Sequence, residues 1–109
     1  SFKCWTKKAD EEVVTTSSLW CEWDAFHIRA LALVREVDEI WEILFLATHP
    51  QRRQSGFMKD LLEEMFRSLP PGGQMWLDVH EHNHRALRLY TSLDFVKVGE
   101  RAQYYSGRD

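Results

Sequence analysis

A basic turn that contains a glycine, Arg53-Gln-Ser-Gly56, is the part of this sequence that points most directly to chemistry. It follows an apolar run from Ile40 to Thr48 and precedes a run with helical spacing from Phe57 to Leu69. The first N–H groups of a helix have no intrahelical partners and lie at the positive end of its dipole. Arg52 and Arg53 add positive charge there. The turn therefore predicts that the protein binds the phosphate groups of a cofactor there and that the reaction takes place at the adjacent strand.

Three histidines at alternate positions, His80, His82 and His84, indicate a different chemistry. On an extended segment they face one way and can bind zinc or nickel. Asn83, however, is expected to start a helix, which turns His84 away from His80. We therefore expect no metal site, and a metal-binding domain remains the least favoured alternative.

Hydrophobic periodicity predicts the elements that position these residues. Expected strands are Leu19–Trp23, Ala25–Val37, Ile40–Thr48, Gln74–His80 and Phe95–Tyr105; expected helices are Phe57–Leu69 and Asn83–Ser92. Residues 1–17 are ambiguous, and a short helix within Trp5–Val14 is open to them. The continuous apolar run Ile40–Thr48 is typical of a strand buried on both faces. The order of elements predicts one α/β domain over residues 1–109, with a central mixed sheet and helices packed on it.

Composition and charge limit the classes of function. The net charge is -3 and Lys and Arg do not cluster in a tail, so nucleic acid is not an expected partner. No apolar run is long enough to span a bilayer, and the first residues do not resemble a signal peptide. Cys4 and Cys21 do not form a CxxC pair; a single disulfide is open to them, but a reduced intracellular chain, cytoplasmic or nuclear, is the simpler expectation.

Several motifs in order resemble the GNAT superfamily of N-acetyltransferases, over roughly Phe26 to Asp109. Arg53-x-x-Gly56-x-Met58 is similar to the family's cofactor turn, and Glu42–Thr48 is similar to its histone-acetyltransferase branch. The segment Asn83–Phe95 resembles the second cofactor-side segment, and Tyr104–Asp109 resembles the branch that acetylates protein N-termini. The resemblance implies a GNAT-like fold that transfers an acetyl group from acetyl-CoA to a primary amine of a protein or peptide.

The resemblance also assigns catalytic roles. The amine must lose a proton, so the site needs a base. Glu42 is the first candidate because apolar neighbours on its strand face are expected to raise its pKa; pairing with a basic residue of the next strand is the alternative. Asp78 is the second candidate, alone or sharing the proton with Glu42 through a water. Tyr90 is the expected general acid, since a phenol has a pKa near 10.

The remaining roles concern binding. Main-chain N–H groups of the turn, with Arg53 as counter-charge, are expected to hold the diphosphate; these residues are Gln54, Ser55, Gly56, Phe57 and Met58. The main chain of Leu46, Ala47 and Thr48 is expected to hold the pantetheine arm. Asn83 is expected to cap its helix and contact the cofactor. Tyr104 and Tyr105 are expected to line the acceptor side, and Arg85 and Arg88 to be solvated.

Two residues depart from the family pattern: Met58 replaces a Gly or Ala, and Asp94 replaces a glycine. Met58 can turn into the core, and Asp94 tolerates the left-handed conformation of a tight turn. The chain also looks truncated at both ends, without a first strand and helix and without a last strand. It is then a fragment, or it completes its sheet with a partner chain or second copy. A catalytically silent acyl-CoA-binding or structural module is the main alternative function.

Overall fold

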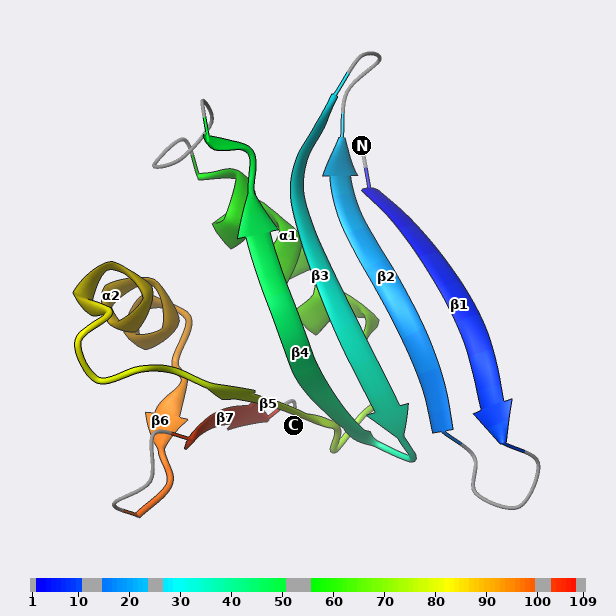
Figure 1. The fold of residues 1–109 in the computed structure, drawn as a ribbon. Coiled ribbons are helices and arrows are strands. Elements are labelled where there is room, and N and C mark those ends of the chain that lie inside the picture. Colours follow the sequence, from blue (N-terminus) through cyan, green and yellow to red (C-terminus); the bar gives the residue numbers. More distant parts are fainter. Residues whose placement is uncertain (1, 11–14, 24–26, 51–55, 100–102, 108–109) are drawn as a thin grey trace.

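Seven strands form one mixed sheet in the order β1-β2-β3-β4-β5-β7-β6, with two helices (Figure 1). The computed structural model describes residues 2–10, 15–23, 27–50, 56–99 and 103–107, with the main chain alone for residues 2–10 and 15. The elements are β1 (Phe2–Asp10), β2 (Thr15–Trp23), β3 (Ile28–Val37), β4 (Ile40–Thr48), α1 (Phe57–Ser68), β5 (Gln74–Asp78), α2 (His84–Ser92), β6 (Val96–Lys97) and β7 (Gln103–Gly107). The expected α/β fold with a mixed sheet is confirmed.

Strands β1 to β4 form an antiparallel meander that α1 covers on one face (Figure 1). Every second side chain of β3, namely Ala30, Ala32 and Val34, is buried toward the core, as period-two spacing predicts. The apolar stripe of α1 packs onto these small residues, with Leu61 and Leu62 fully buried. The expected helix is therefore confirmed to within one residue of its end.

The N-terminal segment differs from the expectation. The sequence left residues 1–17 ambiguous, with a short helix within Trp5–Val14 as an option, and the structure instead has Phe2–Asp10 as β1, which pairs with β2 from Phe2↔Glu22 to Asp10↔Thr15. A helix of this length is marginal alone, so pairing with an available strand edge outweighs its local propensity. Residues 11–14 lie outside the described part of the chain.

Strand β4 is not buried on both faces, which corrects the reading of its apolar sequence. Trp41 and Ile43 are buried, whereas Leu44 and Phe45 are 46% and 57% exposed. The register shifts at this point: Val34 faces Ile43 but Leu33 faces Phe45, so Leu44 is the extra residue of a β-bulge. The uninterrupted apolar run therefore reflects a bulge and exposed apolar side chains, and not burial on both faces.

The two central strands, β4 and β5, separate soon after they pair. Their parallel ladder covers Ile40–Glu42 against Gln74–Trp76, and β4 then continues to Thr48 without pairing to β5 (Figure 1). The result is a fork whose inner edge is the second half of β4. Beyond β5, the segment predicted as one strand, Phe95–Tyr105, is two short antiparallel strands, β6 and β7. Gly99, with φ 59°, lies between them.

Helix α2 begins and ends as its sequence predicts. The Asn83 side chain caps it by accepting a hydrogen bond from the Ala86 N–H at 3.2 Å. After the helix, Asp94 adopts φ 65°, and the Phe95 N–H donates to the Tyr90 carbonyl at 3.0 Å. The expected left-handed conformation of Asp94 is thus confirmed. Within the described residues, no helix is long and apolar enough to cross a bilayer.

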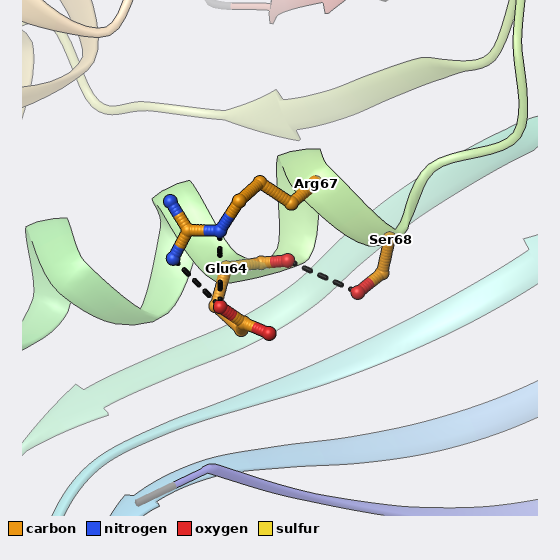
Figure 2. A network of polar contacts seen from close by, with 3 residues as sticks. All are labelled: Glu64, Arg67 and Ser68. Carbon is orange, nitrogen blue, oxygen red and sulfur yellow. Dashed lines mark hydrogen bonds and ion pairs between the residues drawn. The ribbon is translucent and has the colours of Figure 1, made fainter.

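The last turns of α1 carry a polar network on the exposed surface (Figure 2). The Arg67 guanidinium donates to the Glu64 carboxylate at 2.6 Å and 3.1 Å, and the Ser68 hydroxyl donates to the Glu64 carbonyl at 3.0 Å. An exposed pair at this spacing contributes only about 0.2–0.5 kcal/mol. The helix is therefore held mainly by its buried stripe.

A glycine at the turn after α1 makes a stability prediction. The N–H of Gly73 donates to the Pro70 carbonyl at 2.8 Å, and a Cβ added there would lie 2.8 Å from that oxygen and 3.1 Å from the Glu39 oxygen. Both obstacles are main chain, so we expect Gly73→Ala to lower the free energy of unfolding by about 1–3 kcal/mol. Urea denaturation followed by circular dichroism measures this. Pro71→Ala, in the same turn but exposed, is the control; equal stability of both variants would contradict the prediction.

Candidate functional site

A cleft of about 660 Å³ lies where the fork of β4 and β5 meets the N-terminal ends of both helices. Its walls come from the second half of β4, the first turn of α1 and the inner side of α2. The lining residues are Phe45, Leu46, Ala47, Thr48, Gly56, Phe57, Met58, Lys59, Asn83, Arg85, Ala86, Leu89 and Tyr90. Most of the described residues predicted to bind a cofactor thus lie together along one cavity.

The β4 wall presents main-chain groups. On one edge, Leu46 and Ala47 pair with Ala32 and Leu31 of β3. On the other edge, β4 has no ladder to β5 beyond Glu42 in the described residues. In an antiparallel strand the N–H and C=O groups that do not serve one neighbour point toward the other side. The main chain of Leu46 to Thr48 can therefore bond an extended ligand that lies in the fork as an added strand.

The α1 wall presents helix-terminal donors. Gly56 is the N-cap with φ 82°, a conformation that favours glycine, and no side chain caps the helix. The first helical bond runs from the Asp60 N–H to the Gly56 carbonyl at 3.0 Å. The N–H groups of Phe57, Met58 and Lys59 therefore lack intrahelical acceptors and border the cleft, where an anion is favoured. The predicted counter-charge and donors Arg53, Gln54 and Ser55 lie outside the described residues.

Tyr90 reaches the cleft from α2 through the core. It is 8% exposed and its ring makes an edge contact with Phe95 at a centroid distance of 5.6 Å. Burial raises the pKa of the Tyr90 phenol from its ordinary value near 10 to about 12. The phenol is therefore protonated throughout the neutral range and can donate a hydrogen bond into the cleft.

The two candidate bases differ in their surroundings. Glu42 accepts a hydrogen bond from Arg35 of β3 at 2.8 Å, and the two side chains are each 46% exposed. Glu42 therefore has a basic partner on a neighbouring strand, as the alternative reading supposed, and its role as a base stays a prediction. Asp78 is exposed on β5, two residues beyond the last pair with β4, and has no ion-pair partner among the described residues. Of the two carboxylates, Asp78 is the one without an ion-pair partner in the described part of the chain, and the role of either as a base stays a prediction.

A model of the "Acetyltransferase (GNAT) family" matches residues 2–95 of this sequence. The chain belongs to the GNAT family of acetyltransferases. Among curated proteins, it is 35% identical over 71 residues to the N-alpha-acetyltransferase RimI of Mycobacterium tuberculosis. That match spans 63% of this chain and 44% of the relative, so less than half of the relative's length is represented.

Solved structures share the GNAT fold. The ribosomal-protein-S18-alanine N-acetyltransferase of Escherichia coli superimposes with a TM-score of 0.64 at 19% identity, over 93% of this chain and 71% of that one. NAA60 of Arabidopsis thaliana, solved in complex with acetyl-CoA, gives a TM-score of 0.63 at 17% identity, over 85% and 76% of the two chains. At these identities the likeness establishes the architecture.

Met58, the main departure from the GNAT cofactor turn, is compatible with an open cleft. Its side chain is half-buried, packs against the hydrophobic core and also borders the cavity. An unbranched thioether adapts to such a boundary position. The cleft therefore keeps its volume beside the methionine, and the turn does not need a second glycine for the cavity to exist.

Two cations of this GNAT cleft were not among the residues predicted to bind. Lys59 lies in the first turn of α1 and Arg85 in the first turn of α2, and both are exposed side chains that border the cavity. Arg85 is exposed, as expected, and it also borders the cavity, while Arg88 lies on the other side of α2 beside His84 and Thr91. Their position in the sequence could have revealed them, because a side chain in the first turn after a cap lies near the helix-terminal donors.

The paired tyrosines do not act as a pair. Neighbours on a strand point to opposite faces, and Tyr104 packs against the core. Tyr105 instead stacks on Trp76, with ring centroids 5.1 Å apart and planes inclined by 20°. Tyr105 therefore shares the sheet face of Glu42 and Asp78, and Tyr104 does not. Their predicted role in holding an acceptor stays a prediction.

The histidine segment does not form a ligand set. His84 lies in α2 after the Asn83 cap, while the His80 and His82 rings are 5.2 Å apart in the preceding turn. Across the described residues, no group of three or more His, Cys, Asp or Glu side chains is placed to hold a metal ion. The geometry therefore gives no support to a metal-binding domain. The side chain of Cys4 lies outside the described residues, so the alternative of a disulfide with Cys21 is not tested.

Proposed function

We propose that this GNAT domain binds acetyl-CoA and transfers its acetyl group to a primary amine of a protein or peptide. The observation that carries the proposal is the cleft itself, where the unpaired edge of β4 leads to the uncapped N-terminus of α1. An extended pantetheine arm fits a strand edge, and a diphosphate fits helix-terminal donors. Both requirements of one cofactor are met in one continuous cavity.

The cofactor would lie with its phosphates at α1 and its thioester deep in the fork. The main chain of Leu46–Thr48 would bond the pantetheine, and the N–H groups at Gly56–Lys59 would bond the diphosphate. Lys59 and Arg85 would neutralise phosphate charge from the two helices, in addition to Arg53 of the turn. Asn83 would keep its capping role at the edge of the cavity.

The transfer step uses groups on both sides of the fork. The amine nitrogen attacks the thioester carbonyl, the C–N bond forms and the C–S bond breaks, while the ammonium has first lost a proton to a carboxylate. Asp78 takes this role more readily than Glu42 because Arg35 already holds Glu42. The attacking nitrogen gives up its second proton, which would reach the departing thiolate through the Tyr90 phenol or through water, while the phenol also donates a hydrogen bond to that sulfur.

A macromolecular acceptor is supported by the relatives. The 35% identical relative is named as an N-alpha-acetyltransferase, and the E. coli structure acts on an alanine of ribosomal protein S18. By this likeness we propose that the protein acts inside the cell. The acceptor amine would approach from the sheet face that carries Asp78 and the Trp76–Tyr105 stack.

Peptide acetylation assayed by mass spectrometry tests the proposed function. One lysine-free peptide has a free α-amine; a second has a blocked α-amine and one lysine. Incubation with acetyl-CoA is expected to add a single acetyl group to the first peptide. Binding of CoA without modification of either peptide would identify a silent cofactor-binding module, and absence of CoA binding would refute the proposal.

Replacing Arg85 with glutamine tests the cofactor site separately. We expect the Kd for CoA in calorimetry to rise about 5- to 10-fold, because a charge-assisted contact to phosphate is lost at an exposed position. Arg88→Gln is the matched control, since it removes the same charge from the same helix outside the cleft. Equal weakening in both variants would indicate a general charge effect and contradict a contact from Arg85.

A further inference from the structure

We infer that Arg29 is a positioning residue of the cofactor cleft, which fixes the start of α1 relative to the end of β4. The inference rests on the proposed function, because it concerns the end of the cleft where the diphosphate would bind. Arg29 lies on β3 and is not among the residues that line the cavity. It would therefore act on the cofactor through a neighbour, namely Phe57, the first residue of α1.

A bulge in β3 directs the side chain of Arg29. Along the paired strands β2 and β3, Glu22 faces Ala30, the register then shifts, and Arg29 is left as the extra residue. Bulges re-aim side chains and are frequent beside active sites. In an unbroken alternation, Arg29 would point away from the face that buries Ala30, which is the face that α1 covers. Its guanidinium instead lies over the Phe57 ring of α1.

A buried carboxylate holds the guanidinium in this position. The Nε of Arg29 donates to one oxygen of Glu22 at 2.6 Å, and its Nη2 donates to the other oxygen. The Glu22 side chain is 6% exposed and the Arg29 side chain 21%. Two parallel bonds to a planar guanidinium fix its orientation as well as its distance, which a lysine ammonium cannot do. The orientation of Arg29 is therefore set by the neighbouring strand.

The oriented guanidinium contacts the first residue of α1. Its central carbon lies 4.3 Å from the centroid of the Phe57 ring, within the range of a cation–π contact. Phe57 is half-buried, packs against the core and also borders the cleft. Because no side chain caps α1 at Gly56, the contact at the next residue helps to fix where the helix begins. The positions of the unpaired N–H groups of the first turn depend on that start.

The main chain of Arg29 is bonded to the end of β4. Its carbonyl accepts a hydrogen bond from the His49 N–H at 2.9 Å, one residue beyond the strand. Arg29 thus contacts the chain on both sides of residues 51–55, with His49 before them and Phe57 after them. The edge of β4 and the donors of α1 would bind different parts of one ligand, so a fixed separation between them favours binding. Arg29 preserves that separation.

Calorimetry with CoA tests this role in the full chain. Glu22→Gln combined with Arg29→Gln removes the ion pair without leaving a buried unpaired charge. We expect the Kd for CoA to rise about 5- to 10-fold, because the cation–π contact with Phe57 is lost. Arg67→Gln is the matched control, since Arg67 pairs with Glu64 near the other end of α1. An unchanged Kd in the folded double variant, or an equal rise in the control, would overturn the inference.

Phe57→Leu shows whether Arg29 acts through Phe57, and it keeps the test valid if the double variant folds poorly. Leucine keeps an apolar side chain but removes the ring, so we expect a rise in Kd of about 5- to 10-fold. When all three substitutions are combined, the rise should not exceed the larger of the two separate effects, because both remove one contact. Multiplication of the two effects, or an unchanged Kd in Phe57→Leu, would also overturn the inference. Circular dichroism checks that each variant is folded.

Steady-state kinetics separate a positioning role from a general loss of structure. The KM for acetyl-CoA should rise with the Kd, while kcat and the KM for the peptide change less than about twofold, since only cofactor binding is weakened. A fall in kcat as large as the rise in KM would overturn the inference. A parent chain that binds no CoA would instead refute the proposed function, and the inference with it. A parent that binds CoA, with variants that bind it equally well, would overturn the inference alone.

Discussion

Asp78→Asn is expected to lower kcat for peptide acetylation about 100-fold or more, which is the ordinary contribution of a general base. Asparagine keeps the shape of the side chain but cannot accept the proton of the acceptor ammonium. Because Asp78 lies on the sheet face where we propose that the acceptor binds and is absent from the lining of the cofactor cleft, the Kd for CoA should change less than twofold. Stopped-flow detection of the released thiol gives kcat, and calorimetry gives the Kd.

Glu42→Gln is the matched comparison for this prediction. Its carboxylate is held by Arg35 in the last paired position of β4 and β5, so we expect a loss of less than about 10-fold. The sequence alone favoured Glu42, whose carboxylate the structure places 46% exposed against Arg35. A large loss in Glu42→Gln with a small loss in Asp78→Asn would restore that first assignment and reject ours.

Tyr90→Phe carries the second large effect. Removing the hydroxyl leaves the aromatic packing against Phe95 in place, so the fold should persist while kcat falls about 100-fold. The expected loss comes from the missing hydrogen bond to the departing sulfur. A thiol has a pKa near 8.5, whereas burial raises the pKa of Tyr90 to about 12. Complete proton transfer from Tyr90 is therefore uphill, and stabilisation of the thiolate is the main contribution.

The raised pKa of Tyr90 also fixes a pH dependence. Because the folded pKa of about 12 exceeds the ordinary value near 10, the folded state holds this proton more tightly than the unfolded state. The stabilisation is complete below pH 10 and is lost as pH rises from 10 to 12. Deprotonation of Tyr90 should therefore cause no fall in kcat below pH 10. In Tyr90→Phe, the free energy of unfolding should fall less between pH 10 and 12 than in the parent. A parent decline at pH 8 that disappears in the variant would contradict this reading.

The architecture was predictable where local signals and long-range packing agree. The stripe of α1 repeats at helical spacing, and Asn83 is a good cap, so both helices appear where the sequence predicts them. The left-handed conformation of Asp94 follows from the tolerance of aspartate for positive φ. In each case the residues that determine the structure are neighbours in sequence.

The errors in the predicted structure arose where pairing between segments distant in sequence determines the conformation. Helix and strand were both open to the N-terminal residues, and only the edge of β2 selected β1. The bulge at Leu44 depends on the register between β3 and β4, which no local pattern reveals. Arg35 and Glu42 are seven residues apart in sequence and meet only across the hairpin. The same limitation hid Arg85, whose distance from the cleft is set by the angle between helix and sheet.

The short ladder between β4 and β5 forms the junction between two parts of the molecule. Three register pairs join the meander and α1 to the β5–β7 unit and α2, with the Phe66–Phe95 contact beside them. A ligand that bonds the free edge of β4 and also touches α2 adds a second connection across that junction. Occupancy should therefore do more than supply a reactant: it adds contacts between two parts that already share one hydrophobic core. Hydrogen exchange of the main-chain amides at the β4–β5 junction should slow when the ligand is bound.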